Sequence, residues 1–171
     1  MKRITSTFTT LVVVIAFTLT GVSGSSAGVA LGVSNAVVAS ATGAGMTTFG
    51  GEQRTFAFSV RKYADGSVKG EAQLDNRFQE RRSHVVIDCL VVNGNRAYVS
   101  GIVTRSTVPG DVGLIWDFAV EDNGEGSGDP TDRMTLLYVF FPQIYPCTSA
   151  ALQAYLDGVF APIESGNIQV H

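Results

Sequence analysis

The stretch TFAFSVRKYADGSVKGEAQL, residues 55–74, decides the fold of this chain. Its first part alternates large apolar side chains with smaller or polar ones, which is the period of two expected of a half-buried strand. The Asp65-Gly66 pair is typical of a tight hairpin turn. After the turn, residues 68–74 alternate again, with charged or amide side chains at every second position. The stretch therefore predicts a β-hairpin with one face toward a core and the other toward water.

Similar strand patterns recur along the rest of the chain. They cover residues 83–92, 96–104, 113–121, 134–141 and 168–170. Short connections with hairpin turns favour an all-β antiparallel meander over a parallel sheet. Small inward residues on some strands face aromatic residues on others, so we expect a small, closed or nearly closed barrel of seven or eight strands. Pairing the last strand with the first would remove the edges of the sheet. A β-sandwich is the alternative, because its strands alternate in the same way.

One short helix is expected near the C-terminus. Residues 150–156 are good helix formers, and Thr148 or Ser149 precedes them as a cap. Their position next to Cys147 would let this helix cover one end of the barrel.

The N-terminal segment is typical of an export signal. Lys2 and Arg3 precede an apolar run over residues 11–19, and small residues follow it. Cleavage after Ala27 or after Ala41 fits the small residues that the peptidase requires. The later cut divides the chain into a signal peptide with its leader, residues 1–41, and a single β domain, residues 42–171. The apolar run is shorter than the roughly 20 residues of a spanning helix, so we expect a secreted or extracytoplasmic monomer with no membrane span in its mature form.

Charge narrows the choice of partners. Loss of Lys2 and Arg3 leaves ten basic residues against fifteen acidic ones, a net charge of −5. Nucleic-acid binding needs a basic face, and the only basic cluster in the sequence is Arg81-Arg82 with Arg77 nearby. We therefore expect no nucleic-acid partner, and the sequence does not identify any other.

The two cysteines, Cys89 and Cys147, are expected to pair. An even cysteine count in an exported protein favours a disulfide, and this one would close a loop of 58 residues. In the chain-entropy description such a loop stabilises the fold by about 4 kcal/mol.

Four segments of the mature chain resemble a group of exported bacterial proteins of unknown function. They are GNRAYVSG at residues 94–101, PGDVGL at 109–114, EDNGEGSGD at 121–129 and GNIQV at 166–170. The resemblance covers nearly all of the mature chain and implies an exported bacterial β domain. It implies no activity and no ligand.

An acidic segment, residues 121–132, matches the spacing of a looped calcium site. Oxygen-bearing side chains fall at positions 1, 3, 5, 9 and 12, with glycine at position 6. The candidate calcium ligands are Glu121, Asn123, Glu125, Asp129 and Asp132. The alternative is a solvated hairpin loop, because the flanking segments are strands and the last ligand is the shorter aspartate. No other cofactor is indicated.

Three further side chains, His84, Asp88 and Asp117, lie within or beside apolar strands. If they faced a cavity, Asp88 or Asp117 would be a candidate acid or base of a secreted hydrolase. The simpler interpretation places all three on the water side of their strands. The familiar nucleophile, zinc and phosphate-loop motifs are absent from the sequence.

Six aromatic residues offer another possibility. Small barrels can hold one apolar molecule, and a lining would come from Phe56, Phe58, Trp116, Phe118, Tyr138 and Phe140. Close packing of the same rings in a filled core is the alternative. The sequence as a whole favours a non-enzymatic β-barrel with a binding or surface-associated role, with a lipocalin-like carrier as the alternative and a hydrolase third.

Overall fold

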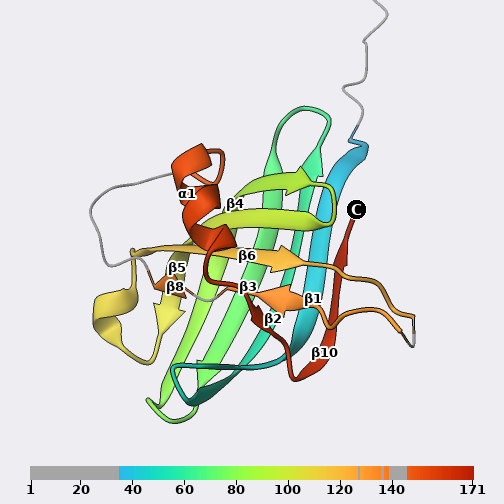
Figure 1. The fold of residues 1–171 in the computed structure, drawn as a ribbon. Helices are drawn as coiled ribbons and strands as arrows, with labels where there is room; N and C mark the ends of the chain where they lie inside the picture. Colours follow the sequence, from blue (N-terminus) through green and yellow to red (C-terminus); the bar gives the residue numbers. More distant parts are fainter. Residues whose placement is uncertain (1–34, 127, 136, 139–145) are drawn as a thin grey trace, which may run out of the picture. The chain divides into compact units, whose positions relative to one another are not determined.

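A computed structural model describes residues 35–171, except 127, 136 and 139–145. Ten strands pair in one antiparallel sheet, in the order β10-β1-β2-β3-β4-β5-β6-β7-β9, with β8 beside β6 (Figure 1). The strands are β1 (Val37–Phe49), β2 (Glu52–Tyr63), β3 (Val68–Asn76), β4 (Arg81–Asn93), β5 (Arg96–Ser106), β6 (Ile115–Glu121), β7 (Arg133–Met134), β8 (Leu137–Tyr138), β9 (Ala161–Pro162) and β10 (Ser165–Val170). A 3₁₀ turn, η1 (Pro109–Asp111), and one helix, α1 (Ala150–Asp157), complete the described elements.

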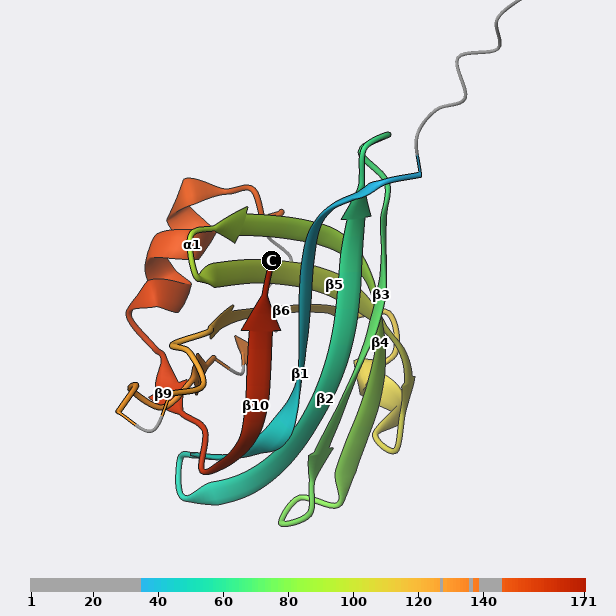
Figure 2. The same ribbon diagram turned by 90° about the vertical axis from the view of Figure 1, so that its right-hand side faces the viewer.

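The sheet curls into a half-barrel, which confirms the predicted all-β antiparallel fold with one short helix (Figures 1 and 2). It is a single continuous sheet and not a sandwich of two. The last strand pairs with the first as expected, since β10 lies antiparallel to β1 with Ile168 opposite Gly43. This pairing does not close the barrel, because β10 and β9 remain the two ends of the strand order. The described residues of the predicted strand over residues 134–141 include two short strands, β7 and β8, both paired with β6, while residues 136 and 139–141 lie outside the described residues.

Aromatic rings fill the inside of the curled sheet. Phe58 contacts Phe118 edge to face with 5.4 Å between ring centroids, and Trp116 lies 5.8 Å from Phe118. A Cβ atom on Gly43 would come within 2.7 Å of the Phe58 ring, so the missing side chain leaves the space that this ring occupies. The expected pairing of small inward residues with rings is therefore present.

Strands β4 and β5 bend midway, and their two halves have different surroundings (Figure 2). The register of β4 against β5 shifts between Ile87 and Cys89, so Asp88 is an extra residue in the ladder. Such a bulge bends and twists a strand. Ile87 and Leu90 both point into the core, three positions apart, and Cys89 is left on the outer face.

Helix α1 packs against the outer face of the bent half. Its buried residues Leu152 and Leu156 form a second apolar cluster with Tyr98, Ala119 and Cys147. Ser149 is its N-cap, with the side chain accepting from the Leu152 amide. The helix was expected over an end of the barrel, but its apolar side chains contact the outer wall because Cys147 is bonded to a cysteine on that wall.

The sheet begins before residue 42. Strand β1 starts at Val37, and Ala41 is fully buried opposite Val60 and Val170. Next to the Ala41–Val170 pair, Ser40 and His171 exchange two backbone hydrogen bonds. Residues 1–34, with the predicted signal and the possible cut after Ala27, lie outside the described residues. No helix in the described part of the chain has the length and hydropathy needed to cross a bilayer.

Candidate functional site

The outer face of the sheet is divided into a covered part and an open part. The covered part, called here the covered face, consists of the outward residues beneath or beside α1 and the disulfide: Cys89, Val91, Tyr98, Ser100, Asp117 and Ala119. The open part, called here the open face, consists of outward residues of β1 to β5: Thr42, Ala44, Ala57, Ser59, Arg61, Lys69, Glu71, Gln73, Arg82, His84 and Arg105. Each part contains residues that the sequence marks as candidates.

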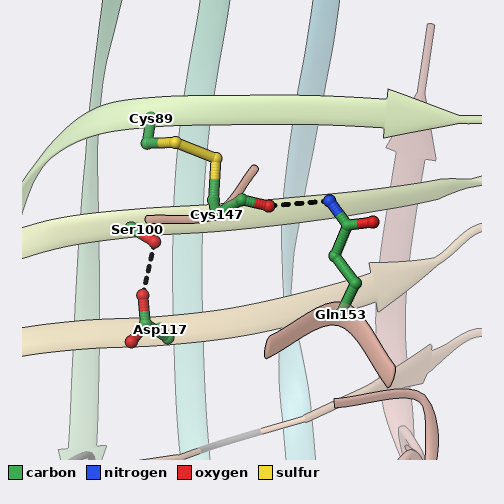
Figure 3. The surroundings of a disulfide bond; sticks show 5 residues. All are labelled: Cys89, Ser100, Asp117, Cys147 and Gln153. Atoms are coloured by element: carbon green, nitrogen blue, oxygen red, sulfur yellow. Dashed lines mark hydrogen bonds between the residues drawn. A yellow bond between two sulfur atoms is a disulfide. The ribbon is translucent and has the colours of Figure 1, made fainter. Parts of the chain in front are cut away.

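The disulfide on the covered face is formed as predicted. Cys89 and Cys147 are joined, with 5.9 Å between their Cα atoms (Figure 3). Gln153 of α1 donates its side-chain amide to the Cys147 carbonyl at 2.8 Å. The bond thus anchors the start of α1 to β4. An intramolecular disulfide also indicates an oxidising, extracytoplasmic environment.

Asp117 lies on the covered face, and its expected position on the water side is wrong. Only 2 % of its surface is exposed, and the Ser100 hydroxyl donates to its carboxylate (Figure 3). Burial raises the pKa of Asp117, the Ser100 hydrogen bond lowers it in part, and the nearby charge of Asp88 raises it further. The sequence did not reveal this burial because strand alternation assigns a residue to a face but does not show whether that face is covered.

In the described part of the chain, the side chains of Asp88 and His84 form no hydrogen bond with the pair of Asp117 and Ser100. Asp88 is exposed at the bulge. His84 is on the open face, where its Nε2 lies 3.1 Å from Glu71 and its Nδ1 lies 3.1 Å from the Thr104 hydroxyl. The three predicted acid-base candidates therefore do not converge on one point.

The acidic loop, residues 121–132, folds against the C-terminal strand. Asp132 accepts the Ile168 amide at 2.8 Å, and Asp122 accepts the Val170 amide at 3.0 Å. Glu125 accepts side-chain amides from Asn167 and Gln169, and these bonds, the Gln169 one first, lower its pKa. Carboxylates thus replace a neighbouring strand along the outer edge of β10.

The five candidate calcium ligands are engaged with different parts of the protein. Glu121 pairs with Arg96 at 2.7 Å and with Arg133 at 3.3 Å. Burial alone would raise the pKa of Glu121, but Arg96 and then Arg133 outweigh it, and the pKa falls below its ordinary value. Asn123 donates to the Thr131 carbonyl, and Asp129 accepts the Gly126 amide. Across the described ranges, no three His, Cys, Asp or Glu side chains are grouped to hold a metal ion.

Four of the six predicted cavity residues lie in the main core. Phe56, Phe58, Trp116 and Phe118 are all buried there, where Phe58 contacts Phe56 and Phe118, and Phe118 contacts Trp116. The backbone of Tyr138 pairs with that of Trp116, while Phe140 lies outside the described residues.

The basic cluster in the sequence is split by the strand alternation. Arg81 turns toward η1 and forms a two-pronged ion pair with Asp111, with 2.7 Å from its Nε to one carboxylate oxygen. That pairing, with help from the Ser106 hydroxyl, lowers the pKa of Asp111. Arg82 points to the open face, where its side chain is 71 % exposed and pairs with Asp75 at 2.8 Å. Arg77 is exposed in the β3–β4 turn.

Shallow grooves run across the open face. One of about 490 Å³ lies over β1 to β3, between Thr42, Ala57 and Gln73. A second of about 380 Å³ lies toward the β2–β3 turn and shares Ser59 and Glu71 with the first. A third of about 330 Å³ over β4 and β5 shares Gln73 with the first. The shared residues make the three grooves one continuous surface.

A pair of cations lies in the second groove. Arg61 of β2 and Lys69 of β3 are directly opposite each other in the ladder. Neither residue was a candidate from the sequence, although both occupy the polar positions of the predicted hairpin.

Comparison with known protein families, curated proteins and solved structures found no match to this chain.

Proposed function

We propose that this chain is an exported, non-enzymatic binding domain of bacterial origin that uses its open face to bind a ligand outside the cytoplasm. The observation that carries the proposal is the division of the outer sheet surface. One half is covered by a disulfide-anchored helix, and the other half is a continuous grooved surface without a covering element among the described residues.

The interior supports binding at the surface over transport of an apolar ligand. Four of the six rings that would line a carrier cavity are buried against one another. Dispersion contacts between closely packed rings stabilise the core, and a ligand would have to replace them.

The chemistry on the covered face is consistent with a structural role. The Asp117 carboxylate is satisfied by Ser100, and none of the three grooves is lined by Asp117 or Asp88. Export is supported by the basic and apolar N-terminal pattern and by the disulfide.

The test uses the disulfide-bonded domain and envelope material from the organism that produces it. We expect labelled protein to co-sediment with this material. Ala57→Tyr places a large ring in the first groove at an exposed strand position, where tyrosine suits a β-strand. It should weaken binding at least tenfold.

The matched control is Ala154→Tyr on the exposed side of α1. It should bind as the unmodified protein does. Equal binding by both variants, or no binding by the unmodified domain, would contradict a role for the open face.

A further inference from the structure

The second groove contains an arrangement that folding alone does not favour. Arg61 and Lys69 are a directly opposed cross-strand pair on the outer face, and both are exposed. Like charges at directly opposed positions destabilise an antiparallel sheet. Within the described part of the chain, neither side chain forms an ion pair with a carboxylate.

The acidic residue that lines this groove, Glu71, is already engaged. Glu71 follows Lys69 on the same face of β3 and lies 3.1 Å from His84 Nε2, on the side of β4. Glu71 therefore interacts away from β2, and the positive charge of Arg61 and Lys69 is left facing the groove.

The walls of the groove add apolar contact to the positive charge. Lys69 Nζ lies 5.7 Å from the centre of the Tyr63 ring, which holds the ammonium by a cation–π contact. Val86 on the far side is 47 % exposed. Ser59 and Gly70 also line the groove, so a ligand would meet two cations, one aromatic ring and one aliphatic side chain.

We propose that this groove binds a small anion: a carboxylate, sulfate or phosphate on a ring-shaped body of about monosaccharide size. This proposal rests on the proposed function and names the chemical class of its ligand. The volume of about 380 Å³ accommodates such a body. A compact anion fits better than a long polyanion, because the net charge of the mature domain, −5, opposes the approach of an extended negative chain.

The test is a titration of the isotope-labelled, disulfide-bonded domain, followed by backbone amide shifts. The probes are glucuronate, glucose 6-sulfate and glucose 6-phosphate, with glucose as the neutral control. The three anions distinguish the carboxylate, sulfate and phosphate sources. We expect at least one anion to shift amides of residues 59–63 and 69–71 with saturation, and glucose to leave them in place.

The decisive variant is Lys69→Glu, which turns the opposed cations into an opposite-charge pair. Because such a pair stabilises a sheet, this variant should melt at or above the temperature of the unmodified domain while its anion affinity falls at least tenfold. Arg77→Glu in the exposed β3–β4 turn changes the net charge equally and should alter the affinity less than twofold.

Two outcomes would overturn the inference. In one, no anion shifts these amides. If the unmodified domain still binds envelope material and Ala57→Tyr does not, the proposed function would stand without this ligand class. In the other, Arg77→Glu weakens binding as much as Lys69→Glu, which would show attraction to overall charge and not to the groove.

Discussion

Asp132 is expected to hold the C-terminal strand in place, and its removal is the sharpest test of the fold. Asp132 is 6 % exposed, and its two carboxylate oxygens accept the Ile168 amide at 2.8 Å and the Asn123 amide at 2.9 Å. Asp132→Ala leaves both amides without this acceptor. A buried donor that loses its partner costs about 1–3 kcal/mol, so we expect the free energy of unfolding to fall by about 3 kcal/mol.

The assay is urea unfolding with a chelator present, so that lost hydrogen bonds and any lost ion are not confused. Hydrogen exchange of the Ile168 amide should accelerate more than that of core amides in β2. Asp132→Asn keeps one acceptor oxygen and should lose about half as much stability. The control Asp129→Ala removes an exposed acid of the same loop, with an expected change within about 0.5 kcal/mol.

Two results would refute this reasoning. One is an Asp132→Ala protein whose stability lies within about 0.5 kcal/mol of the unmodified domain, below the range for a lost buried hydrogen bond. The other is an Ile168 amide that stays protected in that variant. Either would mean that the carboxylate is not what satisfies the outer edge of β10.

Three further outcomes follow from the structure. Replacing both Cys89 and Cys147 by serine should lower the free energy of unfolding by about 4 kcal/mol in urea titrations, and a loss below about 1 kcal/mol would contradict the anchoring role of the bond. The pKa of Asp117 is raised in the folded state, so its contribution to stability is present below the unfolded pKa and lost as pH rises through the folded pKa. The melting temperature of Asp117→Asn should therefore rise relative to that of the unmodified domain between pH 3 and pH 7. A difference in melting temperature that is constant with pH would argue against this. Cleavage after Ala41 would remove the first part of β1, so intact mass of the exported protein should show a cut after Ala27, and a mature chain beginning at residue 42 would be the contrary result.

The strands could be predicted because their signal is local. Alternation at residues 56–60 and 68–74 assigns each side chain to a face without knowledge of the rest of the chain. The register of β2 against β3 was harder to predict from the sequence. The β2–β3 turn has three residues, with Gly66 at φ 84° and Tyr63 hydrogen-bonded to Ser67, and this length places Arg61 opposite Lys69. The two-residue turn expected from Asp65-Gly66 would instead place Lys62 opposite Lys69.

The sites depended on contacts between distant segments. The spacing of oxygens in the acidic loop matches an ion site, yet Asp132 and Glu125 bind groups on β10 more than 35 residues away. Asp117 is buried on the face that carries the disulfide and α1, and its own strand gives no sign of this. In both cases the sequence pattern of the segment was real, but the groups that each side chain contacts were determined by tertiary packing.

The pairing of β1 with β10 brings the two ends of the folded domain to one corner, since Ser40 and His171 face each other across the ladder. A linker of about five residues, each spanning about 3.4 Å, would therefore join His171 to Val37. New termini opened at the exposed Asn93-Gly94 turn would give a circular permutant with the same strand neighbours. Such a rearranged chain would carry both of its new ends at the β4–β5 turn, where another protein could be fused.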